Sequence, residues 1–156
     1  MNEYRLKTYL QEANVHIERL REILKEIKKY YPLNLDTFLN FNLEEKNLFD
    51  AFVFRFAKLQ DLIGAKIFRN FLEYSDFITK GKSFLEILRE IEKEGIIDID
   101  TWMELRKIRN FLSHDYPQED EEKIEYINLL IEKIPILFEV VEKIESKVKR
   151  IWNKSY

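Results

Sequence analysis

The sequence predicts an all-α protein, an up-and-down bundle of four to five helices in which the first, second and last helices are long. Apolar residues recur at spacings of three and four through most of the chain, which is the period of an amphipathic helix. No segment alternates apolar and polar residues for long enough to form a strand, and the connections between periodic segments are short. Because no repeat or linker interrupts the pattern, residues 1–156 are expected to form a single domain.

The first two helices are expected to be long. Pro32 ends the first, because proline cannot continue a helix. The capping-box sequence from Asn42 to Glu45 begins the second, which is expected to run to about Leu72 and to be followed by a connection over residues 74–81. The expected apolar faces are Leu6, Leu10, Ala13, Ile17, Leu20, Leu24, Ile27 and Tyr31 in the first helix, and Leu48, Phe52, Phe56, Leu59, Ile63 and Ile67 in the second.

Two shorter helices follow. The first stops at Gly95, which suits the left-handed residue at a helix C-terminus. Asp98 or Asp100 caps the second, which Pro117 prevents from continuing. Their expected apolar positions are Phe84, Leu85, Leu88 and Ile91, and then Trp102, Leu105, Ile108 and Leu112.

The last helix begins after Gln118. Its first turn, residues 119–122, is acidic, which suits the positive end of a helix dipole. Pro135 is expected to kink it. Its apolar face consists of Ile127, Ile131, Ile134, Phe138, Val141, Ile144, Val148 and Ile151.

Composition excludes several classes of protein. The chain has no cysteine, which removes thiol nucleophiles, thiolate metal sites and disulfides, and none of its three glycines lies in a dinucleotide or phosphate-loop motif. The longest stretch without a charged residue runs only from Thr37 to Leu43, and the amino terminus lacks the apolar block of a signal peptide. We therefore expect a cytoplasmic protein without membrane association. A net charge of −3 means that any phosphate-binding site must be local.

Apolar stripes at helical spacing are normally core. The cluster Phe49, Phe52, Phe54 and Phe56 is therefore expected to fill the bundle, or an interface with a second copy, rather than to stack on nucleic-acid bases. The residue three before each histidine is apolar, so the glutamate–histidine pairs of di-iron bundles are absent and we expect no metal and no cofactor. His16 is expected to be structural.

The segment around His114 is dense in polar groups. At about 100° per residue, several hydrogen-bonding side chains share a sector beside the apolar face of the helix. His114 is expected in or just after the last turn, where helix carbonyls and Asp115 favour imidazolium, so that it can act as acid or base near neutral pH. The residues of that sector are Arg106, Arg109, Asn110, Ser113 and His114.

The sequence Arg109-Asn110-Phe111-Leu112-Ser113-His114-Asp115-Tyr116 resembles the R-x4-H-x-Y motif of HEPN proteins, specifically the HepT-type toxins paired with minimal nucleotidyltransferase antitoxins. The resemblance covers these eight residues. It includes the polar residue after the arginine, and the helical bundle of that family agrees with the periodicity.

The resemblance implies a metal-independent endoribonuclease whose site forms across a homodimer, with Arg109 and His114 of both copies in one cleft. Asn110 and Ser113 would support the site. Arg106 and Lys107, and beyond them Lys66 or Arg69, are candidates for local phosphate contacts. The substrate is RNA and not DNA, because the reaction needs the 2′-hydroxyl. The resemblance further implies that the partner nucleotidyltransferase transfers AMP to Tyr116 and so stops the activity.

Two alternatives remain open from the sequence. In the first, the chain is a non-catalytic helical module that binds a nucleotidyltransferase. In the second, the motif has no function: Arg109 pairs with Glu104 or another surface acid, and His114 and Asp115 simply end a helix.

Overall fold

Every regular element of the described chain is a helix, which confirms the predicted all-α class. The computed structural model describes residues 2–115 and 117–154, with side chains from residue 3 to residue 150 apart from residue 116. The elements are α1 (Asn2–Ile27), the 3-10 helix η1 (Lys28–Tyr30), α2 (Leu35–Leu39), α3 (Leu43–Leu62), the π-helix η2 (Ile63–Ile67), α4 (Phe68–Tyr74), α5 (Phe84–Lys93), α6 (Ile99–Leu112) and α7 (Asp120–Lys154).

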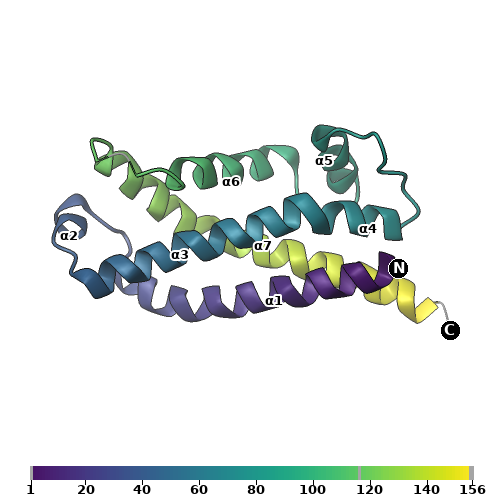
Figure 1. Ribbon diagram of the computed structural model, residues 1–156, viewed down its shortest axis with the longest axis horizontal. Helices are drawn as coiled ribbons and strands as arrows, with labels where there is room; N and C mark the ends of the chain where they lie inside the picture. The colour runs from purple at the N-terminus through teal and green to yellow at the C-terminus, as the bar shows by residue number, and fades with distance from the viewer. Residues whose placement is uncertain (1, 116, 155–156) are drawn as a thin grey trace.

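Four long segments run up and down the bundle. Figure 1 shows α1 leading away from the N-terminus, α3 and α4 returning beside it, α6 running back and α7 crossing to the far end. α1 packs mainly on α3, and α6 packs on α7. The buried apolar side chains form one hydrophobic cluster to which all of these long segments contribute. α6, which carries the motif, therefore stands on a rigid base formed by α3 and α7.

The first helix follows the predicted seam except at its end. All the predicted seam residues up to Ile27 are buried. Tyr31 is 40% exposed instead, because the chain tightens into η1 and then turns extended at Tyr31, whose hydroxyl donates a hydrogen bond to Glu132. The short helix α2 was not predicted; its N-cap is Asn34, whose side chain accepts a hydrogen bond from the Thr37 amide at 2.9 Å.

The predicted capping box opens α3. The Asn42 side chain accepts a hydrogen bond from the Glu45 amide at 2.8 Å, and the Glu45 carboxylate accepts one from the Asn42 amide at 3.0 Å. α3, η2 and α4 follow one another without a break to Tyr74, close to the predicted end near Leu72. The predicted apolar face is buried, with Leu48 only partly so.

The shorter helices begin and end largely as predicted. Gly95 has φ of +74°, and its amide donates to the Glu92 carbonyl at 2.9 Å, which confirms its role as the C-terminal stop of α5. Leu85 was wrongly predicted to be buried: it is 46% exposed, and Ile87 takes its place in the core. Asp98 caps α6, accepting from the Thr101 amide at 2.7 Å, and this bond lowers the pKa of its carboxyl group.

α6 ends at Leu112, well before Pro117, and all its predicted apolar residues are buried. α7 begins with the predicted acidic turn and continues across Pro135 to Lys154. Its predicted apolar residues are buried up to Val148, and the side chain of Ile151 lies outside the described residues. Within the part of the chain that is described, no helix combines the length and the apolar content needed to cross a membrane.

His16 is held by a neighbouring helix, in agreement with its predicted structural role. Arg55 Nη1 on α3 lies 3.2 Å from His16 Nδ1, and because arginine only donates, Nδ1 is the acceptor. Burial, followed by the charges of Arg55 and Lys58, lowers the pKa of His16 below its usual value. The folded protein therefore favours the neutral form of this imidazole.

The lowered pKa of His16 predicts a pH effect on stability. As the pH falls through about 6.5, the ordinary histidine value, the unfolded chain takes up a proton before the folded one does, so folding loses stability. We expect His16→Gln, which can still accept from Arg55, to lose less unfolding free energy than the unmodified protein between pH 7.5 and 5. Urea unfolding of both proteins at the two pH values measures this. Equal losses would contradict the assignment.

Candidate active site

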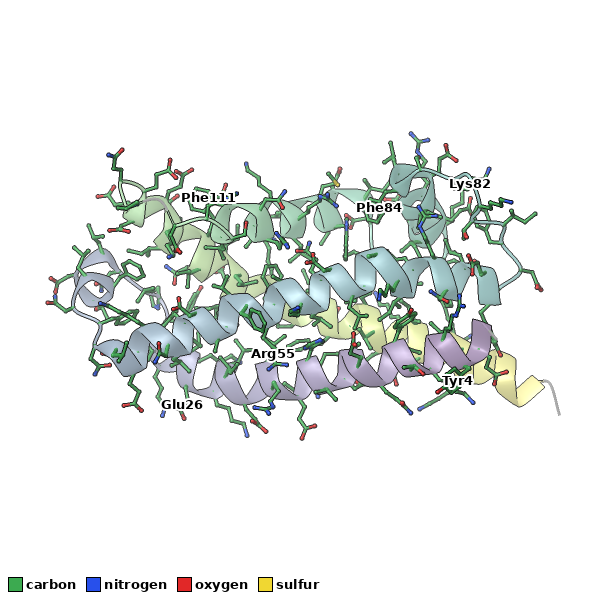
Figure 2. All side chains as sticks on the ribbon, in the orientation of Figure 1. Tyr4, Glu26, Arg55, Lys82, Phe84 and Phe111 are labelled. Atoms are coloured by element: carbon green, nitrogen blue, oxygen red, sulfur yellow. The ribbon has the colours of Figure 1, made fainter. Side chains whose placement is uncertain are left out.

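The motif occupies the last turns of α6 and the residues just after it. Arg106, Arg109 and Asn110 lie on the helix, and Ser113 is its C-terminal cap. The His114 amide donates to the Phe111 carbonyl at 3.3 Å, which fixes the backbone of His114 against the helix end, while its side chain is exposed. Figure 2 shows Phe111 at this end of α6. An exposed imidazole therefore follows the end of α6, five residues after Arg109.

Arg109 is held by a carboxylate from another helix. Its Nε donates to Asp61 Oδ1 at 3.3 Å, and its Nη2 donates to Asp61 Oδ2 at 2.9 Å. The partner is thus Asp61 on α3, whereas Glu104 pairs with Lys133 of α7 at 3.3 Å. This forked pair fixes the plane of the guanidinium, and Nη1 takes no part in it.

A pocket of about 540 Å³ opens between α6, α5 and the junction of α3 with η2. Three of the predicted site residues share its wall, which therefore combines two guanidinium groups with an amide. The pocket is lined by Gln60, Asp61, Gly64, Ala65, Phe84, Trp102, Arg106, Arg109 and Asn110. Of the predicted site residues, Lys107, Ser113 and His114 are exposed and are not part of this lining.

The π-helix η2 shapes the floor of this pocket. A π-turn widens the backbone locally and is frequent at functional sites. A Cβ atom on Gly64 would lie 2.8 Å from Cζ2 of Trp102 and 3.7 Å from Cζ of Phe84. Trp102 is only 2% exposed and packs on Phe68, with ring centroids 4.9 Å apart. Glycine is therefore required here so that the indole can lie directly on the π-turn.

We expect Gly64→Ala to destabilise the protein. The added methyl group overlaps an immobile buried ring, and overpacking of this kind costs about 1–3 kcal/mol, which exceeds the roughly 1 kcal/mol that alanine gains over glycine in a helix. Urea unfolding measures the change, and Ala65→Gly, at the exposed neighbouring position, is the control for helix propensity. A Gly64→Ala protein as stable as the unmodified one would show that the indole is free to shift.

Gln60 and Trp102 carry buried polar atoms without partners. Gln60 is 3% exposed, and neither Oε1 nor Nε2 has a hydrogen bond among the described residues; the same holds for Nε1 of Trp102. Sequence reasoning missed Gln60, Asp61, Gly64, Trp102 and Phe84 as site residues. The available signal was Gln60 itself, a polar residue one turn after Phe56 on the apolar face of its helix.

The remaining predicted residues have mixed roles. Ser113 Oγ donates to the Asn110 carbonyl at 2.8 Å, a bond that closes the end of α6. Arg106 lies over the Phe84 ring, 5.7 Å from its centroid, at the pocket rim. Arg69 donates to the carbonyls of Thr79 and Lys82 and so holds the connection before α5 rather than facing a ligand.

Two further sequence expectations concern the neighbourhood of the motif. Lys66 lies over the Tyr9 ring, 5.2 Å from its centroid, on the side of the π-helix that faces α1. Tyr116, the expected AMP acceptor, lies outside the described residues. Among the described residues, no three histidine or acidic side chains gather closely enough to hold a metal ion.

Comparisons of this chain with protein-family models, with curated proteins and with solved structures found no match. The motif and the geometry around it are therefore the features of this chain that bear on its function.

Proposed function

We propose that this protein is a metal-independent endoribonuclease that acts as a homodimer. One observation carries the proposal: α6 places Arg106, Arg109 and Asn110 on the wall of one pocket and ends two residues before an exposed histidine. Guanidinium groups bind phosphate, and an accessible imidazole transfers protons near neutral pH. Together these groups can bind and cleave a ribose–phosphate linkage.

The reaction needs only the chain's own side chains. The imidazole of His114 takes the proton of an RNA 2′-hydroxyl as that oxygen attacks the adjacent phosphorus. The bond from phosphorus to the 5′-oxygen breaks, and the His114 imidazolium of the second copy gives its proton to the departing oxygen. The products are a 2′,3′-cyclic phosphate and a 5′-hydroxyl. Each chain supplies one histidine to this chemistry, so two copies complete the acid–base pair.

Arg109 stabilises the additional negative charge of the pentacoordinate phosphorus. Asp61 keeps the guanidinium in a fixed plane through Nε and Nη2, and a phosphate oxygen approaches Nη1. The Asp61 carboxylate is 57% exposed, so water and salt screen its repulsion of the phosphate. Asn110, on the same wall, orients the phosphate by hydrogen bonding.

An apolar groove next to the motif supports the homodimer. Leu39 and Phe54 are 61% and 56% exposed and line it together with Asp115, the neighbour of His114. The same groove is also lined by two positively charged lysines and two negatively charged aspartates. Opposite charges on one surface can pair across a contact between two identical copies. In a dimer formed through this groove, the two copies of His114 would lie close to the interface, because the neighbouring Asp115 lines the groove. Phe49, Phe52 and Phe56 of the phenylalanine cluster are buried in the bundle, so Phe54 is the member of that cluster available for an interface.

The motif also supports a regulatory partner. A minimal nucleotidyltransferase would transfer AMP from ATP to the hydroxyl of Tyr116 with loss of pyrophosphate. The added nucleotide is bulky and anionic, and it stands two residues from His114 in the sequence. It would obstruct an RNA phosphate and repel it, and cleavage would stop.

Cleavage of a labelled RNA oligonucleotide in EDTA tests the proposal. The protein is first treated with phosphodiesterase to remove any AMP, and a DNA strand of the same sequence is the control. We expect RNA fragments that end in a 2′,3′-cyclic phosphate and an intact DNA strand. RNA left intact by a protein that still forms a tight complex with a nucleotidyltransferase would favour the non-catalytic binding module instead.

A further inference from the structure

The Gln60 amide is a buried group that the proposed reaction does not use. Both its polar atoms lie beneath the accessible surface without a hydrogen-bond partner among the described residues, on the wall that also carries Arg109. Leaving an amide unpaired in a protein interior is costly, so such a group normally has a partner that binds there. The position of Gln60, beside a phosphate-binding guanidinium, indicates where to look for that partner.

Trp102 adds a second unpartnered donor close by. Gln60 and Gly64 are one helical turn apart and line the same pocket, and Cζ2 of the Trp102 indole packs on Gly64. Cζ2 and Nε1 are bonded to the same ring carbon, so the indole N–H belongs to this wall as well. The wall therefore offers one acceptor, Oε1, and two donors, Nε2 of Gln60 and Nε1 of Trp102.

The hydrogen-bonding roles of these three atoms, one acceptor and two donors, indicate which class of ligand can pair with all of them. A phosphate offers only acceptors and would leave Oε1 unpaired. A planar heterocycle with a donor beside an acceptor pairs with both atoms of an amide, and nucleobase edges have this pattern. Phe84, tilted against the buried Trp102 indole with ring centroids 6.3 Å apart, adds an aromatic ring to the pocket wall, and a pocket of about 540 Å³ is in the range that holds small ligands.

We propose that this pocket is a base-binding subsite, in which Gln60 and Trp102 hold one nucleobase of the RNA strand while the attached phosphate lies at Arg109. The inference rests on the proposed function, because it takes that phosphate to be part of an RNA substrate. Phe84, with Arg106 over its ring, lines the same pocket, and a bound base has to displace the side chains that cover the Gln60 amide. The subsite makes cleavage depend on the base beside the scissile bond.

Calorimetric titration of the full chain with AMP, GMP, CMP and UMP tests the subsite, with ribose 5-phosphate as the ligand without a base. We expect at least one nucleotide to bind about tenfold or more tightly than ribose 5-phosphate, a discrimination of the size that a good amide–base pair gives. Gln60→Met, of similar volume and without polar atoms, should remove that difference and leave the protein at least as stable. Gln11→Met, at an exposed position of α1, is the matched control.

The same proteins are then tested on homopolymeric RNA in EDTA. Loss of base preference in Gln60→Met with cleavage retained supports the subsite. Tight, Gln60-dependent nucleotide binding without any cleavage also supports it, while contradicting the proposed nuclease. The inference is overturned if all four nucleotides bind no better than ribose 5-phosphate although RNA is cleaved. It is equally overturned if Gln60→Met only unfolds more easily, the result expected when the amide holds a buried water.

Discussion

His114→Ala is expected to reduce RNA cleavage by at least about 10²–10⁴-fold, the range associated with loss of one positioned general acid or base. Because both copies of a homodimer lose their imidazole at once, the acid and the base disappear together. The side chain is exposed beyond the end of α6, so the unfolding free energy should change by less than about 0.5 kcal/mol. Initial rates on a labelled RNA in EDTA, together with urea unfolding, measure both quantities.

His16→Gln is the matched control, because His16 is the other histidine of the chain and accepts from Arg55 between α1 and α3. This variant should cleave at the rate of the unmodified protein near neutral pH. Joint unfolding and refolding of equal amounts of unmodified and His114→Ala chains should leave about a quarter of the dimers with two imidazoles. A mixture that retains half of the activity would show that each chain acts alone.

Arg109→Ala is expected to lower the cleavage rate by about 10²–10³-fold, as does removal of one donor from other oxyanion sites. Arg109→Lys should recover little, because an ammonium group cannot both pair with the Asp61 carboxylate through two donors and reach the phosphate. KM for a short RNA should change less than kcat, since the charge on the phosphorus is greatest in the transition state. Steady-state kinetics on one oligonucleotide separates the two constants.

If the Arg109–Asp61 pair had only a structural role, Arg109→Ala would affect stability and not the cleavage rate. The pair is partly exposed, at 29% and 57%, and pairs of this kind contribute roughly 0–1 kcal/mol to folding. Loss of the pair therefore cannot unfold the protein and cannot reduce activity a hundredfold through stability. Arg21→Ala, which breaks the exposed pair with Glu142, is the control. If Arg109→Ala lowers the rate no more than Arg21→Ala does, Arg109 is structural.

The helical period identifies most of the core because burial of one face is what stabilises each helix. It fails where local geometry changes. Tyr31 leaves the seam because the chain tightens into η1 before Pro32. Leu85 faces solvent because the core-facing side of α5 is formed by Phe84, Ile87, Leu88 and Ile91, which follow the helical spacing without it. The five-residue helix α2 is too short for a period to be recognised, and only its cap Asn34 indicates it.

The sequence predicted the polar site residues on α6 but not those on α3. Arg106, Arg109 and Asn110, predicted to share one sector of a helix with Ser113 and His114, line one pocket, and the other two residues do not. Asp61 was missed because its pairing with Arg109 joins helices 48 residues apart in the chain, which no local pattern encodes. Gln60 was missed because it is a single polar residue within the apolar face of its helix, and one such residue does not by itself indicate a pocket.

A DNA strand with one ribonucleotide tests the central claim most directly, because it offers a single 2′-hydroxyl to the protein. In EDTA, the unmodified protein should cut this strand only at the phosphate that follows the ribonucleotide, and His114→Ala should leave it intact. Cutting at deoxynucleotides, or equal cutting by both proteins, would contradict an imidazole-driven attack by the 2′-hydroxyl.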